Sequence, residues 1–209
     1  RPGDGKEPDS IAYVQCAGSR DETLGVPYCS RICCMYAIKQ AMLLSGALPL
    51  ADITIYYMDI RTFGKGYEQF YQNAQAMGIE FVKGKVARIH EDDAHNPIVR
   101  VELVDEGRIV ERQHDLVVLS VGMVPAFNPQ ATYGVPPAVD DGFVAQPFAS
   151  LSPCLTPRRG IFATGTAVGP MDIVDSIVMA GAAAAETAAY LHARQAAAPS
   201  APRRELAHA

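Results

Sequence analysis

Residues 11–46 read IAYVQCAGSRDETLGVPYCSRICCMYAIKQAMLLSG, and their pattern is that of a strand followed by a helix. The apolar run at 11–16 predicts a short buried strand, and the polar residues 17–27 predict a loop. Across 28–45, apolar residues recur at spacings of three and four, which predicts a helix that stops at Gly46. A strand that leads into a helix is the repeating unit of a parallel α/β sheet.

The rest of the chain continues this alternation of strands and helices. Strand patterns occur at 52–58, 79–90, 98–104, 108–113, 115–121 and 160–164. Helical patterns occur at 66–77 and 171–192. The continuous apolar run DLVVLSV at 115–121 is typical of a central strand in a parallel sheet. The expected fold class is therefore α/β, a doubly wound Rossmann-like design.

The same pattern divides the chain into segments. We expect a linker at 1–10, a Rossmann-like domain at 11–125, a smaller α/β segment at 126–194 and a disordered tail at 195–209. The segment 126–194 has too few predicted strands to form a domain alone. It is therefore expected to pack against sequence that this chain does not contain.

The composition argues against several classes of protein. With 49% hydrophobic and 20% charged residues, a chain of 209 residues can bury a core, so wholesale disorder is not expected. A formal net charge of −5 disfavours a basic nucleic-acid-binding surface. No unbroken apolar run approaches the roughly 18–20 residues that span a bilayer, and no leader pattern is visible. We therefore expect a cytoplasmic protein without a transmembrane segment.

Four of the five cysteines, Cys16, Cys29, Cys33 and Cys34, lie within nineteen positions of one another. Cys16 ends the first predicted strand and Cys29 opens the predicted helix, so both are expected at the crevice outside the carboxyl ends of the strands. Cys33 follows Cys29 by one helical turn, and Cys34 lies about 100° further round the helix. The positive end of the helix dipole is expected to lower the pKa of these thiols and to favour thiolates.

The spacing C-x12-C-x3-C-C leaves four interpretations open. Adjacent Cys33 and Cys34 suit the separate corners of a bulky iron–sulfur cubane better than the paired knuckles of a structural zinc site. Redox-active thiols and small buried hydrophobic residues are the other two interpretations. Arg20 and Arg31 are close in sequence and are expected to offset the negative charge of a ligated cluster. Cys154 stands apart in a loop with prolines on both sides and is interpreted as a free cysteine.

Five segments of the chain carry a family resemblance. They are QCAGSRDE (15–22), PYCSRICCMYAIKQA (27–41), YMDIRTFGKGYEQFYQNAQ (57–75), VVLSVGMVP (117–125) and GIFATGTAVGPMDIVDSI (160–177). Together they resemble the A subunit of heterodisulfide reductase, an iron–sulfur flavoprotein family with a thioredoxin-reductase-like core. The resemblance implies a Rossmann-like domain of the pyridine-nucleotide–disulfide-reductase type, joined to the carboxyl part of an FAD-binding domain.

The resemblance also implies roles for individual residues. Cys16, Cys29, Cys33 and Cys34 match the [4Fe–4S] cluster ligands of the family. The residues that match its FAD-contacting motif are Gly165, Thr166, Pro170, Met171, Asp172 and Ile173. The first two would approach the ribityl or pyrophosphate part of FAD. The last four would open a helix that points at the flavin ring system, where a helix N-terminus stabilises negative charge.

Two features of the family are absent from this sequence. No G-x-G-x-x-G fingerprint occurs, and no ferredoxin-like C-x2-C-x2-C module occurs. The chain therefore resembles the carboxyl half of the reductase-like core. FAD is expected to be shared with an amino-terminal half or with a partner chain.

The resemblance implies an oxidoreductase subunit that passes electrons between a [4Fe–4S] cluster and FAD, with flavin-based bifurcation in some members, and that is active together with partner subunits. The expected partners are a chain that supplies the missing flavin half, other subunits of a redox complex, and ferredoxin-like or iron–sulfur electron carriers. Two other hypotheses remain. One is a non-catalytic or zinc-stabilised assembly module of a larger redox complex. The other is a nicotinamide oxidoreductase, which needs a phosphate cradle that the sequence does not contain.

Overall fold

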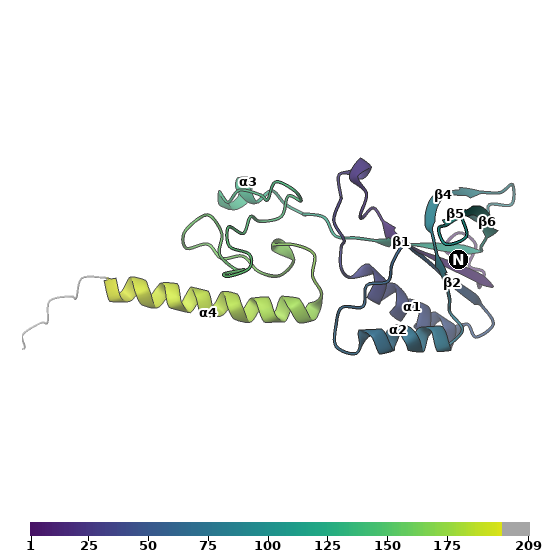
Figure 1. Ribbon diagram of the computed structural model, residues 1–209, viewed down its shortest axis with the longest axis horizontal. Coiled ribbons are helices and arrows are strands. Elements are labelled where there is room, and N and C mark those ends of the chain that lie inside the picture. The colour runs from purple at the N-terminus through teal and green to yellow at the C-terminus, as the bar shows by residue number, and fades with distance from the viewer. Residues whose placement is uncertain (198–209) are drawn as a thin grey trace, which may run out of the picture. The chain divides into compact units, whose positions relative to one another are not determined.

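The computed structural model describes residues 1–197, and the chain divides into two units, Arg1–Val124 and Pro125–Ala209 (Figure 1). Each unit has its own buried apolar cluster. The first unit carries most of the regular secondary structure and all four clustered cysteines. The two units are therefore described one after the other.

A four-stranded parallel sheet forms the centre of the first unit. Its strands, in spatial order, are β3 (Glu80–Lys83), β2 (Asp52–Tyr57), β1 (Ser10–Ala17) and β7 (Leu116–Val121). Two helices, α1 (Cys33–Ala47) and α2 (Tyr67–Ala76), cover one face of this sheet (Figure 1). The predicted α/β class and the alternation of strands and helices are confirmed.

The inner strand β1 is buried on both faces, which explains its continuous apolar sequence. Ile11 and Tyr13 pack with Ile38 of α1, in the cluster between the sheet and the helices. Ala12 and Val14 point the other way and belong to a second cluster. This alternation follows from the two-residue period of a strand.

A three-stranded antiparallel sheet covers the other face of the parallel sheet (Figure 1). Its strands are β4 (Lys85–Glu91), β5 (Pro97–Leu103) and β6 (Arg108–Gln113). The single strand predicted at 79–90 is wrong, because the chain leaves one sheet at Gly84 and enters the other. A Cβ at Gly84 would lie 2.5 Å from the carbonyl oxygen of Glu102, so only glycine fits at this crossing.

The position of β7 also differs from the prediction. The sequence predicts a central strand at 115–121, but among the described residues β7 pairs with β1 alone and lies at the edge of the sheet. Leu119 and Val121 are 51% and 58% exposed. An apolar run indicates two faces suited to burial, and in β7 part of that surface is uncovered within the described residues.

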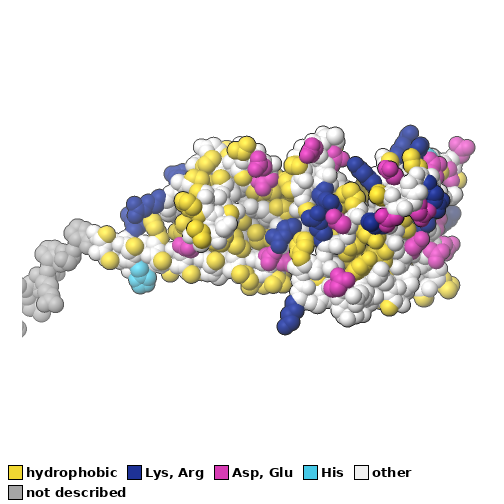
Figure 2. Space-filling view, viewed as in Figure 1, with side chains coloured by type: hydrophobic (Ala, Val, Ile, Leu, Met, Phe, Trp, Pro, Cys, Tyr) yellow, Lys and Arg dark blue, Asp and Glu magenta, His cyan; other side chains and the backbone are white. Residues whose placement is uncertain are grey.

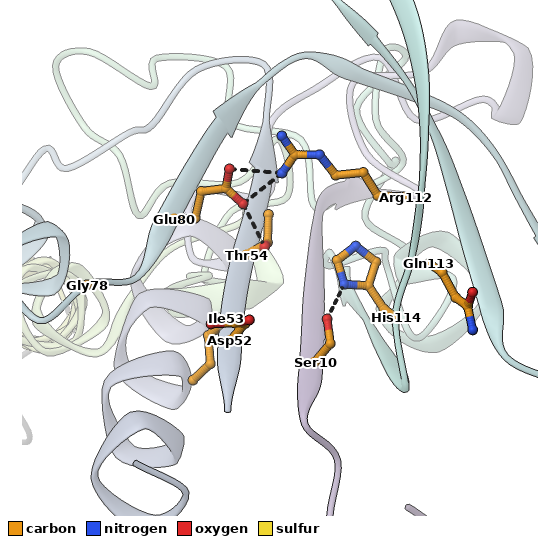
Figure 3. A pocket seen from close by; sticks show the side chains of 9 residues that line it. All are labelled: Ser10, Asp52, Ile53, Thr54, Gly78, Glu80, Arg112, Gln113 and His114. Carbon is orange, nitrogen blue, oxygen red and sulfur yellow. Dashed lines mark hydrogen bonds and ion pairs between the residues drawn. The ribbon is translucent and has the colours of Figure 1, made fainter. Parts of the chain in front are cut away.

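A buried histidine joins three elements at the amino ends of the parallel strands. His114 follows β6, and its Nδ1 and Nε2 are hydrogen-bonded to Ser10 Oγ of β1 (2.8 Å) and to the Tyr56 hydroxyl of β2 (2.9 Å). Burial lowers the pKa of His114. The imidazole lines a cavity of about 500 Å³ (Figure 3). The same cavity is lined by an ion pair, in which Arg112 Nη1 donates a hydrogen bond to Glu80 Oε2 (2.7 Å). These polar groups satisfy one another, so we assign this cavity no ligand.

The second unit contains less regular structure. Its helices are α3 (Pro129–Tyr133), the 3-10 turn η2 (Gly165–Ala167) and α4 (Ile173–Ala197). Its buried apolar side chains are Val135, Val144, Val168 and Met171. The strand predicted at 160–164 is wrong, since Phe162 forms only an isolated antiparallel bridge with Leu155. A short apolar run becomes a strand only where a neighbouring strand is available to pair with it.

Helix α4 leaves its apolar side chains uncovered within the described residues. Ile173, Val174, Ile177 and Val178 are between 59% and 78% exposed, and apolar side chains are visible along α4 in Figure 2. By length and composition alone, α4 is the one described helix able to cross a membrane, whereas no transmembrane segment is predicted from the sequence. Because α4 continues to Ala197, the predicted disordered tail is wrong for 195–197, and the rest of that segment lies outside the described residues.

Candidate functional site

Strained backbone surrounds the cysteines at the carboxyl ends of β1 and β2. Cys16, Arg20 and Arg31 have φ values of 58°, 58° and 63°, in the left-handed region. Only four non-glycine residues of the described chain have positive φ, and three of them lie in this one segment. Such a conformation costs about 1–2 kcal/mol per residue and is concentrated at functional sites, where surrounding contacts hold it in place.

Cys29 lies outside the helix, which corrects the sequence-based placement. Helix α1 begins at Cys33, with Ile32 as its N-cap. The left-handed φ of Arg31 interrupts any helix that would start earlier, and the Arg31 backbone N–H donates to Cys29 Sγ (3.3 Å). Cys29 and Cys33 therefore do not share a helix face. Cys29 belongs to a turn, whereas Cys33 and Cys34 form the first turn of α1.

Two buried serines hold the cysteine-bearing loops together. Ser19 Oγ lies 2.7 Å from Ser30 Oγ, and neither side chain is more than 2% exposed. The Ser30 hydroxyl also accepts a hydrogen bond from the backbone N–H of Met123 (2.9 Å), just after β7. A Cβ at Gly122 would lie 2.0 Å from both hydroxyl oxygens, so no other residue fits there. Sequence reasoning missed this contact because no local pattern links the three segments.

Three of the four thiols interact directly. A hydrogen bond with Cys33, together with burial, raises the pKa of Cys16 far above its usual range. The bond with Cys16 lowers the pKa of Cys33, but its bond with Cys34 and its burial raise that pKa to about 11. The pKa of Cys34 is lowered by its bond with Cys33. The expected lowering by the helix dipole is therefore wrong for Cys16 and Cys33. Cys29 acts electrostatically on Cys33 and Cys34, so all four lie in one neighbourhood.

Charged side chains flank the thiols. Asp59, just after β2, accepts hydrogen bonds from Arg20 Nη1 (2.7 Å) and Arg61 Nε (3.1 Å). Both guanidinium groups interact electrostatically with Cys16. Arg20 therefore lies where the sequence predicts a compensating charge, and Arg61 and Asp59 are the residues that sequence reasoning missed. Arg31 instead stacks over an aromatic ring, 5.3 Å from its centroid.

The chemistry of this donor set suits an iron–sulfur group. All four candidate ligands are thiols, which such clusters prefer, and two cationic side chains offset their charge. Both amide atoms of the Gln15 side chain, at the end of β1, are buried without hydrogen-bond partners in the described chain. Within residues 1–197, no three His, Cys, Asp or Glu side chains are arranged to hold one metal ion.

The candidate flavin-contacting residues all lie in the second unit. Gly165, Thr166, Pro170, Met171, Asp172 and Ile173 occupy η2, the loop after it and the first residue of α4. Gly165 has a φ of 62°, and the neighbouring Thr164 hydroxyl is buried without a partner in the described chain. Asp172 Oδ1 accepts a hydrogen bond from the Asp175 backbone N–H (2.8 Å), so it caps α4. The six residues thus lie together in one stretch from η2 to the start of α4, as the four cysteines lie together in the first unit.

Similarity to known proteins points to one family, although no protein-family model matches the chain. The chain is 47% identical over 197 residues to a CoB–CoM heterodisulfide reductase iron–sulfur A subunit of Methanopyrus kandleri. The matched region covers 92% of this chain and 30% of the Methanopyrus protein. The chain is 46% identical over 188 residues to the corresponding A subunit of Methanocaldococcus jannaschii, covering 88% and 29%. The A subunit of the H2:CoB–CoM heterodisulfide,ferredoxin reductase of Methanothermobacter marburgensis is 42% identical over 192 residues, covering 90% and 29%. The chain thus spans about 30% of the length of these relatives.

Two solved structures share the fold. The thioredoxin reductase of Lactococcus lactis matches with a TM-score of 0.58 at 18% identity, over 90% of this chain and 54% of that one. The thioredoxin reductase of T. acidophilum matches with a TM-score of 0.54 at 16% identity, over 90% and 53%. At this level of identity the match establishes the fold alone. The predicted pyridine-nucleotide–disulfide-reductase-type fold is confirmed.

Proposed function

We propose that this chain, which is homologous to one segment of the heterodisulfide reductase A subunit, is an electron-transfer subunit that passes electrons between a [4Fe–4S] cluster and FAD. The observation that carries the proposal is the convergence of four thiols, from the end of β1, one turn and one helix start, at the carboxyl edge of a parallel sheet. Because the chain spans about 30% of its relatives, the complete reaction requires other segments or subunits.

The cluster ligands would be Cys16, Cys29, Cys33 and Cys34. A cluster there would supply one-electron transfer. The contact of Ser19 with Ser30 holds the loop after Cys16 and the turn with Cys29 in place before any ligand binds, which reduces the entropy cost of binding. Arg20 and Arg61 offset the negative charge of the thiolates, while Asp59 holds both guanidinium groups in position.

The second unit would supply part of the FAD site. Gly165 and Thr166 would lie against the ribityl or pyrophosphate part, and Pro170, Met171, Asp172 and Ile173 would lead into the N-terminus of α4. That helix end would stabilise negative charge on the flavin, which would convert between one-electron and two-electron steps. The unpartnered buried hydroxyl of Thr164 supports a polar ligand at this position.

The uncovered side chains of α4 support a partner that completes the flavin unit. The structural match covers 54% of a thioredoxin reductase, and the curated relatives are about three times as long as this chain. The occupant we propose for α4 is the amino-terminal part of the same FAD-binding unit, on this or another chain. The remaining partners would be other subunits of a cytoplasmic redox complex and ferredoxin-like or iron–sulfur electron carriers, with flavin-based bifurcation as a further capacity.

The incomplete flavin site favours one alternative function. In that alternative the cysteines hold zinc or no metal, and the chain is an assembly module that docks into a larger redox complex. The uncovered face of α4 serves both functions equally well, so metal content distinguishes them.

Anaerobic purification with iron and sulfide assays, followed by EPR before and after dithionite, tests the proposal. We expect about four irons and four sulfides per chain and a signal of a reduced cubane cluster. Serine at any one of Cys16, Cys29, Cys33 or Cys34 should reduce the iron content and visible absorbance. Cys154→Ser, which changes a buried thiol of the second unit, is the matched control and should retain both. Full iron in all four variants, or stoichiometric zinc in the wild type, would contradict the proposal.

A further inference from the structure

A tight turn in the second unit lies against α4 and carries two arginines. The Ile161 backbone N–H donates to the carbonyl oxygen of Arg158 (3.1 Å), and Gly160 has a φ of 83°, as the third residue of a type II turn requires. The buried Thr156 hydroxyl accepts the Arg158 backbone N–H (3.2 Å) and donates to the carbonyl oxygen of Ile161 (2.9 Å). A Cβ at Gly160 would lie 2.9 Å from the Tyr190 hydroxyl, so the turn and Tyr190 of α4 are in close contact.

Arginines gather around this contact. The guanidinium carbons of Arg159 and Arg194 each lie 5.9 Å from the centroid of the Tyr190 ring. Arg194 Nη1 also donates to the Tyr190 hydroxyl (3.4 Å). Arg158 and Arg159 line a hollow of about 370 Å³ between the turn and α4, and Arg158 Nη1 is fixed by a hydrogen bond to the carbonyl oxygen of Tyr133 (2.5 Å). All three guanidinium groups therefore lie at or beside one hollow.

These arginines have no carboxylate partner. In the part of the chain that the structure describes, no ion pair includes Arg158, Arg159 or Arg194. The only acidic residue that lines the hollow within residues 1–197 is Glu186, and no ion pair joins it to them. Like charges held close together raise the electrostatic energy, and a bound anion lowers it. The arrangement therefore indicates an anionic ligand.

The hollow also has an apolar wall. Leu155, Phe162 and Ala189 line it together with the arginines, and the Phe162 ring contacts the Tyr190 ring edge-on, with 5.8 Å between centroids. Small-molecule sites begin at roughly 300 Å³, so this volume is larger than an inorganic anion needs. A ligand that fills the hollow therefore has an organic part next to its anionic group. None of the six candidate flavin-contacting residues lines the hollow in the described chain.

We propose that this hollow binds an organic phosphate of nucleotide size. Arg158, Arg159 and Arg194 surround the phosphate, and the apolar wall lies against the organic part. Guanidinium groups bind phosphate oxygens through paired N–H groups, and several positive charges match a group that is almost doubly charged at neutral pH. The inference goes beyond the proposed function, because it uses neither the thiols nor the candidate flavin-contacting residues.

Isothermal titration calorimetry of the full chain with ADP, at low ionic strength, tests this inference. We expect saturable binding of ADP, and adenosine, which lacks the phosphates, should bind at least about tenfold more weakly. Arg159→Gln and Arg194→Gln should each raise the Kd for ADP about tenfold, as expected for the loss of one charged hydrogen-bond donor. Arg88→Gln removes an exposed arginine from β4 of the first unit and is the matched control with an unchanged Kd.

Several results would overturn the inference. One is the absence of saturable ADP binding by the wild-type chain, and another is an equal Kd in wild type and both arginine variants. Adenosine binding as tight as that of ADP would exclude phosphate recognition. A hexaglutamate peptide that binds more tightly than ADP would assign the hollow to an acidic protein segment instead. Because these titrations do not depend on iron, a chain that binds no iron would contradict the proposed function and leave this test unaffected.

Discussion

Ser19 Oγ and Ser30 Oγ lie 2.7 Å apart in the interior and join the loop after Cys16 to the turn that carries Cys29. The Ser30 hydroxyl also accepts the Met123 backbone N–H, which ties both loops to the end of β7. Three segments that are distant in sequence therefore meet at one pair of hydroxyls. The contact places the cysteine loops without using any thiol, so all four thiols remain available as ligands.

Gly122→Ala should destabilise the first unit by about 1–3 kcal/mol, because the new methyl group would overlap both serine hydroxyls. Urea unfolding followed by circular dichroism measures this change. Gly46→Ala, near the end of α1 with open space around it, is the matched control and should be neutral or slightly stabilising. A Gly122→Ala chain as stable as wild type would show that the serine contact does not constrain the loops.

The stability of the chain should fall as the pH drops below 6.5. Burial lowers the folded-state pKa of His114 from its ordinary value of 6.5, so the unfolded chain binds the proton first. Above pH 6.5 the neutral imidazole makes its full contribution to the free energy of unfolding. That contribution is lost as the pH falls from the pKa of the unfolded state to the lower pKa of the folded state. Urea unfolding at a series of pH values from 7.5 to about 5 measures this slope.

His114→Gln should be less stable at neutral pH and should show a shallower pH dependence, since the titrating group is gone. His95→Gln changes an exposed ring in a loop of the same unit and should keep the wild-type slope. Identical slopes for wild type and His114→Gln would assign the pH dependence to other groups.

Asp59→Asn should change the midpoint potential of a bound cluster more than it changes the free energy of unfolding. The carboxylate is 46% exposed in its ion pair with Arg20, so its loss should cost less than about 1 kcal/mol. Removal of a negative charge beside the thiols should shift the midpoint potential of a bound cluster to a more positive value. Asp105→Asn breaks a surface ion pair with Lys83 elsewhere in this unit and is the control. Equal midpoints for Asp59→Asn and wild type would exclude an electrostatic role for Asp59.

Ile177→Lys should leave the isolated chain intact and impair its assembly. Ile177 is 68% exposed on α4, so the change should alter the free energy of unfolding by less than about 0.5 kcal/mol. Binding to the amino-terminal segment of a heterodisulfide reductase A subunit, measured by calorimetry and by retained flavin absorbance, should weaken about tenfold or more. Val139→Lys, at an exposed apolar residue of the same unit, should bind normally. Normal binding by Ile177→Lys would place the partner elsewhere.

Local patterns predicted most of the first unit correctly. The strand at 11–16, the strand at 52–58 and the helix at 66–77 correspond to β1, β2 and α2 within one or two residues. Each is recognisable because its buried residues recur with the period of its backbone, which is that of a strand for β1 and β2 and that of a helix for α2. The short spacing of four thiols was also visible in the sequence, and their role as cluster ligands stays a prediction.

Two of the errors share one cause, which is dependence on partners far away in the sequence, and the third has a local cause. The run at 79–90 has the composition of one strand, but the approach of Glu102 at Gly84 divides it between two sheets. The run at 160–164 has the composition of a strand, but within the described residues it forms only a single bridge. Cys29 was placed at the start of the helix predicted over 28–45, but the left-handed backbone of Arg31 prevents that and α1 begins at Cys33.

The sequence by itself determined the α/β class, the order of the main elements and the four thiols that define the candidate site. Local periodicity and residue chemistry are enough for these features. Only the tertiary structure decided that the thiols interact, that a bond with Cys33 and burial raise the pKa of Cys16, and that a bond with Cys34 and burial raise the pKa of Cys33. Those properties depend on distances between segments that are remote in the chain, and no local pattern records such distances.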